Sequence, residues 1–164
     1  MSKVIIINTE MCTGCRMCEI SCALRHTHEC NPERSRIRVM INEAEGPAAF
    51  VASTCMQCEI AMCELVCPTG AVGRSYTTGA KIIDPGKCIS CGSCSIACPF
   101  GACFVDRQIG RSVVCDHCRG DPVCVAVCPT GALRYVEADE ANIHLKRAGA
   151  PSISSVMHNV RPRR

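Results

Sequence analysis

The chain has 164 residues and a formal net charge of +3, and 18 of its residues are cysteines. This exceeds the roughly 8–10% at which cysteine becomes the organising residue of a fold. Trp is absent and only three Phe and two Tyr are present, which excludes the well-filled aliphatic and aromatic core usual at this length. Groups held by cysteine are therefore expected to replace much of the core.

The cysteines could form disulfides in an oxidising compartment or bind metal inside a cell. The N-terminal apolar stretch, Val4–Ile7, is too short for a secretory signal, and no twin arginine is present. One uncharged segment, Cys88–Val105, has the nominal length of a membrane span, but it contains five cysteines and Pro99. We therefore expect a soluble, cytoplasmic protein without a membrane span that binds metal through thiolates.

Short runs rich in β-branched residues predict strands that lead into the cysteine-rich loops. These runs are Val4–Ile7, Phe50–Ala52, Lys81–Ile83 and Ser112–Val114. Ile37–Ile41 and Ala48–Ala52 flank a turn containing Gly and Pro and predict an inserted hairpin. Gly70–Lys87 holds a strand, a turn and a second strand. Residues 137–148 carry acids early and bases late, which predicts a helix that Pro151 ends.

Sixteen cysteines form four groups of four, each within 11 to 14 residues. Group 1 is Cys12, Cys15, Cys18 and Cys22; group 2 is Cys55, Cys58, Cys63 and Cys67; group 3 is Cys88, Cys91, Cys94 and Cys98; group 4 is Cys115, Cys118, Cys124 and Cys128. Groups 2, 3 and 4 end in Cys-Pro-x-Gly-Ala, which makes an internal repeat. Group 1 departs from it because Ala23 follows Cys22.

This spacing predicts [4Fe–4S] clusters. Three cysteines at short intervals let a loop wrap one corner of a cubane, with each thiolate on a different iron. The fourth cysteine points away from that corner, and the proline after it ends the local turn. It is therefore placed to bind a second cluster, as in two-cluster ferredoxins. Zinc is the alternative, although zinc sites usually combine two cysteine pairs about 12–20 residues apart.

Two pairings of the groups are compatible with the spacing. Groups 2 and 3 are separated by 20 residues, as in a small ferredoxin, and groups 1 and 4 would flank them as an outer pair. This nested pairing predicts four ligand sets: set 1, Cys12, Cys15, Cys18 and Cys128; set 2, Cys115, Cys118, Cys124 and Cys22; set 3, Cys55, Cys58, Cys63 and Cys98; set 4, Cys88, Cys91, Cys94 and Cys67. Sequential pairing, of group 1 with 2 and of group 3 with 4, is the alternative.

The other cysteines and the histidines are not expected to bind metal. Cys103 is expected to be a buried thiol that packs on a cluster, and Cys30 a bystander thiol. His26, His28 and His117 could replace a ligand, but every cysteine group is already complete. No nucleophile–base pair, phosphate loop or dinucleotide fingerprint is present, which predicts a chain without catalytic residues of its own.

The net charge changes once metal is counted. Sixteen thiolates and four oxidised cluster cores of about +2 each would bring the charge from +3 to about −5. The mildly basic composition therefore does not predict binding to nucleic acid.

The four groups, the CPTGA and CPFGA repeats, and KCISCGSCSIACPFGA at Lys87–Ala102 resemble the four-cluster electron-transfer subunits of molybdenum and tungsten oxidoreductases. Formate dehydrogenase, dimethyl sulfoxide reductase, nitrate reductase and the ferredoxin-like partner of carbon monoxide dehydrogenase contain such proteins. The resemblance covers residues 3–136 and implies nested ligation. It also implies an α+β, duplicated bacterial-ferredoxin-like fold with pseudo-two-fold symmetry and four [4Fe–4S] clusters as its core.

A narrower resemblance lies in CEISCALRH at Cys18–His26 and NPERSRIRV at Asn31–Val39. These stretches look like the small iron–sulfur subunits found with tungsten-containing aldehyde oxidoreductases and with the tungsten subunit of aromatic acyl-CoA reductases. The implied function is an oxygen-sensitive relay of single electrons from a large tungsten or molybdenum pterin subunit, expected to be an aldehyde oxidoreductase, to ferredoxin or a flavin-containing NAD-reducing subunit. The alternatives are a hydrogenase, formate or carbon monoxide dehydrogenase as partner, or a zinc-binding structural module.

Two parts of the chain are expected. Residues 1–136 form the four-cluster domain, and residues 137–164 form a C-terminal helix and docking tail. Within the domain, an inner ferredoxin unit at 53–105 is flanked by the first group at 1–30, the hairpin insertion at 31–52 and the fourth group at 106–136. The tail could hold a partner subunit or a second copy of this chain, and a frayed, solvated end is the alternative.

Overall fold

The computed structural model describes residues 3–41 and 50–141. In this part of the chain the strands are β1 (Lys3–Ile7), β2 (Arg38–Ile41), β3 (Phe50–Ser53), β4 (Val72–Arg74), β5 (Lys81–Ile83), β6 (Phe104–Asp106), β7 (Arg111–Val113) and β8 (Leu133–Glu137). The α-helices are α1 (Met17–Thr27), α2 (Met62–Leu65), α3 (Ser93–Ala97) and α4 (Val123–Ala126). The 3₁₀ helices are η1 (Thr9–Met11), η2 (Pro32–Arg34) and η4 (His117–Gly120). This mixture of short helices and strands confirms the expected α+β class.

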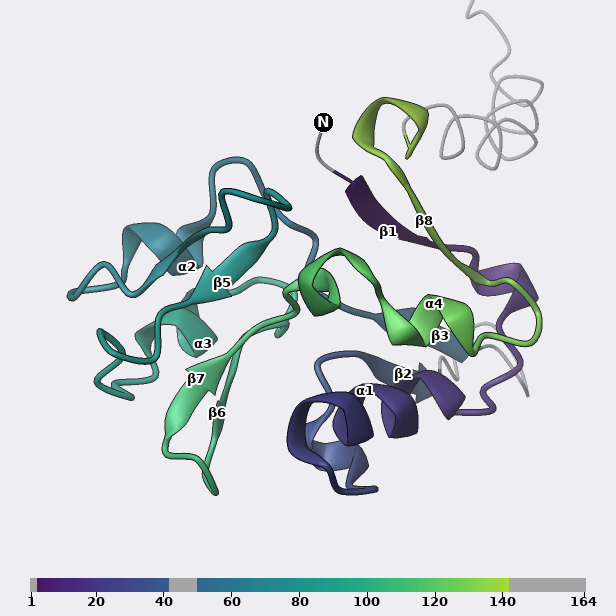
Figure 1. Cartoon of the computed structure of the whole chain (residues 1–164), viewed down its shortest axis with the longest axis horizontal. Helices are drawn as coiled ribbons and strands as arrows, with labels where there is room; N and C mark the ends of the chain where they lie inside the picture. The colour runs from purple at the N-terminus through teal and green to yellow at the C-terminus, as the bar shows by residue number, and fades with distance from the viewer. Residues whose placement is uncertain (1–2, 42–49, 142–164) are drawn as a thin grey trace, which may run out of the picture.

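The elements divide between two halves that lie side by side in Figure 1. In the outer half, β1 pairs with β8 and α1 packs on α4, so the beginning and the end of the described chain meet there. The β2–β3 ladder lies in the same half. In the inner half, α2 packs on α3 beside the antiparallel ladders β4–β5 and β6–β7. Group 1 is therefore a neighbour of group 4, and group 2 of group 3.

The predicted strands are present, with shifts of one or two residues. β5 has the predicted bounds, whereas β7 begins and ends one residue early. The predicted hairpin is β2–β3, in which Val39 lies opposite Ala52, and its turn lies outside the described residues. The sequence did not predict β6 or β8. The β6–β7 hairpin spans the expected boundary between residues 105 and 106.

The C-terminal prediction is only partly within the described residues. Residues 138–141 are helical, and the rest of the expected helix and the docking tail lie outside them. No helix in the described part of the chain has the length and apolarity needed to cross a bilayer. The uncharged segment 88–105 contains α3, which has five residues.

Proline after the fourth cysteine explains why three of the helices are short. α2, α3 and α4 have four or five residues and end just before Cys67, Cys98 and Cys128. A residue that precedes proline is disfavoured in helical conformation, and Cys98 has an extended backbone with ψ of 112°. Because no proline follows Cys22, α1 continues past it to Thr27 and has 11 residues in all.

The buried interior is small and rich in sulfur. In the outer half it joins cysteines to aliphatic side chains: Cys18, Cys22, Cys124, Ile37, Val39, Ala52 and Leu133. In the inner half, Cys94 and Cys103 pack with Val72. Cys103 is 2% exposed, which confirms the expected buried thiol, and Cys30 is exposed. Thiols therefore occupy places that aliphatic side chains fill in an ordinary core.

Glu19 is a buried carboxylate that joins α1 to β2. It is 4% exposed, and its Oε1 accepts a hydrogen bond from the Val39 N–H at 2.7 Å. Glu19→Ala leaves that amide without a partner, which costs about 1–3 kcal/mol. We expect the thermal midpoint of anaerobically purified protein, followed by circular dichroism, to fall by several degrees. Glu10→Ala, at an exposed position in η1, is the control, and an unchanged midpoint for Glu19→Ala would contradict this role.

Candidate iron–sulfur sites

Each cysteine group begins with a Cys-x-x-Cys loop that contains the same left-handed turn. The residue before the second cysteine has φ between +54° and +70° in all four loops: Gly14, Gln57, Ser90 and His117. This conformation costs a non-glycine residue about 1–3 kcal/mol, yet three of these residues are not glycine. Successive N–H groups in such turns form anion-binding concavities. The repeated geometry therefore fits loops that surround a negatively charged group.

Three cavities in the described part of the chain each bring together four cysteines from two groups. They are lined by Cys12, Cys15, Cys18 and Cys128; by Cys55, Cys58, Cys63 and Cys98; and by Cys67, Cys88, Cys91 and Cys94. These are the cysteines of sets 1, 3 and 4. Among the described residues, no carboxylate or histidine lines these cavities. A donor set of four thiols suits iron–sulfur clusters, and also zinc.

The cysteines of set 2 come together in the interior of the outer half. All four are buried: Cys22, Cys115, Cys118 and Cys124. Burial raises the pKa of the Cys124 thiol, and the neighbouring thiols of Cys115, Cys22 and Cys118 raise it further. Buried thiolates that repel one another need a cation, and iron would supply it.

Burial dominates the pKa of several other ligand candidates. It raises the pKa of Cys18 and Cys55 to about 11 and that of Cys115 to about 12. The backbone N–H groups of Gln57 and His117 act in the opposite direction on Cys55 and Cys115. Because the thiolate is the metal ligand, metal binding must displace these protons.

The Cys-Pro-x-Gly-Ala repeat directs an N–H group at its own cysteine. Gly70 and Gly101 adopt φ of +63° and +60°. The next residue then donates to sulfur: Ala71 N–H to Cys67 Sγ at 3.2 Å, and Ala102 N–H to Cys98 Sγ at 3.4 Å. Hydrogen bonds to ligating sulfur tune the potential of a cluster. The repeat was recognised from sequence, but this donor role was not.

Cys22, which lacks the repeat, receives its donor from elsewhere. The Arg36 N–H donates to Cys22 Sγ at 3.3 Å. Arg36 lies between η2 and β2, so the segment after α1 folds back onto the cysteine that α1 carries. No local motif after Cys22 signals this contact.

Lys81 is a buried cation beside set 3. Its side chain is 1% exposed, lines the cavity of that set, and pairs through Nζ with the Glu64 carboxylate. Burial and the Cys98 thiol raise the pKa of Cys63, whereas the charge of Lys81 lowers it. A cation here favours the thiolate form of the ligands. The sequence showed Lys81 only as the first residue of a strand.

Gln57 joins set 2 to set 3 across the two halves. Its Nε2 donates to the Cys115 carbonyl at 2.8 Å, and its Oε1 accepts the Lys81 N–H at 2.6 Å. The Cys55 thiol is close enough to Cys115 to contribute to the raised pKa of that thiol. Sets 2 and 3 are therefore adjacent, and they link the outer half to the inner half.

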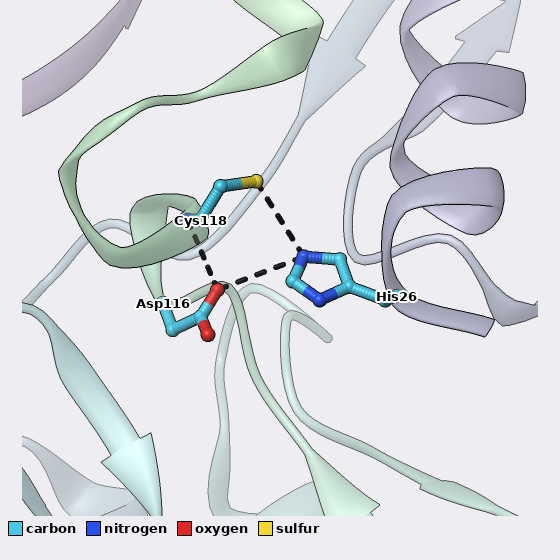
Figure 2. Close-up of side chains that lie close together, drawn as sticks. All are labelled: His26, Asp116 and Cys118. Atoms are coloured by element: carbon cyan, nitrogen blue, oxygen red, sulfur yellow. Dashed lines mark hydrogen bonds and ion pairs between the residues drawn. The ribbon is translucent and has the colours of Figure 1, made fainter. Parts of the chain in front are cut away.

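Figure 2 shows His26, Asp116 and Cys118 pointing toward one another. His26 Nε2 lies 3.5 Å from Cys118 Sγ and 3.6 Å from Asp116 Oδ1. Asp116 Oδ1 accepts the Cys118 N–H at 3.0 Å and lies 2.9 Å from a guanidinium nitrogen of Arg36. Burial lowers the pKa of His26 to about 4, and the charge of Arg36 adds to this effect. The imidazole is therefore neutral near pH 7.

The other two histidines differ in their surroundings. His28 is exposed. His117 is 1% exposed, and its ring meets the Tyr135 ring at a centroid distance of 5.2 Å. Neither ring nitrogen of His117 has a hydrogen-bond partner among the described residues. Of these three histidines, His26 is the one in hydrogen-bonding distance of a group-4 cysteine.

Two iron–sulfur domain families match the chain. Residues 47–138 match the 4Fe-4S dicluster domain, and residues 9–25 match a 4Fe-4S binding domain. Together the matches contain all four cysteine groups. They confirm the prediction that [4Fe–4S] clusters are the cofactors.

Relatives of known name match over most of the chain. The polyferredoxin-like subunit of aliphatic sulfonate oxidoreductase from Pyrococcus furiosus is 41% identical, over 93% of this chain and 88% of that protein. The thiosulfate reductase electron transfer subunit PhsB of Salmonella typhi is 34% identical, over 85% and 78%. The electron transport protein HydN of Escherichia coli K12 is 31% identical, over 85% and 91%. With its all-cysteine donor sets, the chain thus binds multiple [4Fe–4S] clusters and belongs to the ferredoxin-type family that carries the 4Fe-4S dicluster domain.

Proposed function

We propose that the chain is a non-catalytic electron-transfer subunit that holds four [4Fe–4S] clusters and relays single electrons between a large catalytic subunit and an external acceptor. The observation that carries the proposal is the gathering of sixteen thiols into four sets, three of which line cavities. Each cluster, when bound, accepts and releases one electron at a potential set by its ligands and surroundings.

The nested ligand sets are favoured over sequential pairing by the contacts between the groups. Cys98 shares a cavity with Cys55, and Cys67 shares one with Cys88, so the inner groups exchange their fourth cysteines. The packing of α1 on α4 and the β1–β8 ladder bring groups 1 and 4 together in the same way. Two halves of matching organisation support the proposed pseudo-two-fold relation, with residues 53–105 as the inner ferredoxin unit.

The order of the sets follows from the contacts between the halves. Sets 2 and 3 adjoin through Gln57, so sets 1 and 4 would be the ends of a line. Exposed apolar side chains lie at both ends: Met17 lines the cavity of set 1 and is 47% exposed, and Ile89 lines that of set 4 and is 64% exposed. Such side chains suit docking surfaces for the catalytic subunit and for the acceptor.

The catalytic partner is proposed to be a tungsten or molybdenum pterin enzyme of the aldehyde oxidoreductase type. The Cys18–His26 and Asn31–Val39 stretches support this choice through their resemblance to the small subunits of such complexes. Two relatives are named as subunits of an aliphatic sulfonate oxidoreductase and of a thiosulfate reductase, which supports a catalytic oxidoreductase partner in general. Ferredoxin or a flavin-containing NAD-reducing subunit is the proposed acceptor.

The first test is the metal content of protein purified without oxygen. Four cubanes predict about 16 iron and about 16 acid-labile sulfide per chain. Iron, sulfide and zinc are measured on the same sample, together with its visible absorbance. About four zinc and no sulfide would instead identify a structural zinc module.

The nested ligation predicts non-additive iron loss in double variants. Cys15→Ala and Cys128→Ala alter the same set, so each single variant and the double variant should lose about four iron. Cys91→Ala with Cys128→Ala alters two sets and should lose about eight. Cys30→Ala is the control and should keep the full complement. Under sequential pairing the results for the two double variants would be exchanged.

The catalytic partner can be identified in the host cell. Tagged protein purified anaerobically should bring with it a large subunit that contains tungsten or molybdenum. Adding an aldehyde to this complex should decrease the visible absorbance of the small subunit, because reduction bleaches iron–sulfur chromophores. Bleaching by formate, hydrogen or carbon monoxide instead would assign one of the alternative partners. A complex without either metal would contradict a pterin enzyme.

A further inference from the structure

His26 owes its position to the residue that follows Cys22. Because Ala23 stands where the other groups have proline, α1 runs on to Thr27. His26 comes four residues after Cys22, and residues with this spacing lie on the same face of a helix. α1 therefore carries a histidine to the region where it delivers Cys22 to set 2.

The contacts of His26 select one tautomer when Cys118 binds iron. A ligating sulfur has lost its proton and can only accept a hydrogen bond. Its partner at 3.5 Å, His26 Nε2, must then carry the hydrogen. Asp116 Oδ1, 3.6 Å from the same nitrogen, is also an acceptor and favours the same tautomer. Arg36 lies 2.9 Å from that carboxylate oxygen and compensates its charge.

We propose that His26 is a positioning residue for set 2, where its Nε2–H donates to Cys118 Sγ and raises the reduction potential of the cluster bound there. This inference rests on the ligand sets of the proposed function. A donor to the ligating sulfur stabilises the more negative, reduced state more than the oxidised state. No histidine lines the cavities of sets 1, 3 and 4 among the described residues. The effect is therefore specific to one of the four clusters.

Redox titration of anaerobically purified variants, followed by electron paramagnetic resonance, tests this role. His26→Leu replaces the imidazole with an apolar side chain of similar size and so removes the donor. One cluster of the four should then be reduced at a lower potential. At a fixed potential its ratio of reduced to oxidised form should fall about tenfold, which corresponds to a shift of about 59 mV for one electron. His26→Gln restores an N–H donor and should give a smaller shift. His28→Asn, at the exposed left-handed end of α1, is the matched control and should match the unaltered protein.

A second measurement separates hydrogen bonding from a merely structural role. In protein labelled with ¹⁵N in the histidine rings only, pulsed electron paramagnetic resonance of the reduced state should detect a coupled ring nitrogen, and His26→Leu should lose it. Four unchanged potentials in a His26→Leu protein with full iron content would overturn the inference. If that variant loses iron, the coupling in the labelled protein decides. A coupling that persists in His28→Asn and vanishes in His26→Gln supports the inference. A coupling that is absent from the unaltered protein overturns it. Failure of the proposed function can be distinguished from failure of this inference, because the unaltered protein would then not contain about 16 iron per chain.

Discussion

Six of the sixteen candidate ligands are buried where a small domain normally packs aliphatic side chains, and we expect the stability of the fold to depend on what these thiols bind. Cys18, Cys22 and Cys124 belong to the buried interior of the outer half, and Cys94 to that of the inner half. Burial favours the protonated thiol, whereas iron requires the thiolate. Cluster insertion would therefore replace buried protonated thiols with metal-bound thiolates, and we expect it to couple folding to metal binding.

One local difference in the repeat has consequences across the outer half. Proline follows Cys67, Cys98 and Cys128, where a short helix ends, and after Cys67 and Cys98 the turn returns an N–H group to the same cysteine. Group 1 has no such proline, so α1 continues, and Cys22 obtains its donor from Arg36 at 3.3 Å. The same continuation brings His26 within 3.5 Å of Cys118. In set 2 the hydrogen bonds from Arg36 to Cys22 and from His26 to Cys118 therefore come from residues distant in the sequence, and not from the residues that directly follow the cysteine.

Cysteine spacing was sufficient to predict the metal type and the four groups, and short runs of β-branched residues predicted most of the strands, because these features depend on local chain geometry. The surroundings of the ligands were not predictable in this way. Lys81, Gln57 and Asp116 are ordinary strand, loop and turn residues in sequence, and each acquires its role from a contact more than 15 residues away. β6 and β8 were missed because each is a short run directly after a cysteine motif, where pairing with β7 or β1 decides the conformation.

The ligand motif repeats four times, but the groups around each ligand set do not repeat. Set 3 lies beside the buried cation Lys81, and set 2 lies beside a neutral imidazole and an Arg36–Asp116 pair. Exposed apolar side chains border sets 1, 3 and 4, and Arg16 also lines the cavity of set 1. Since charge, hydrogen bonding and solvent exposure set the potential of a cluster more than its four sulfurs do, identical ligands here need not give identical potentials. A repeated ligand motif can in this way come to hold clusters of different potential through substitutions that leave every cysteine in place.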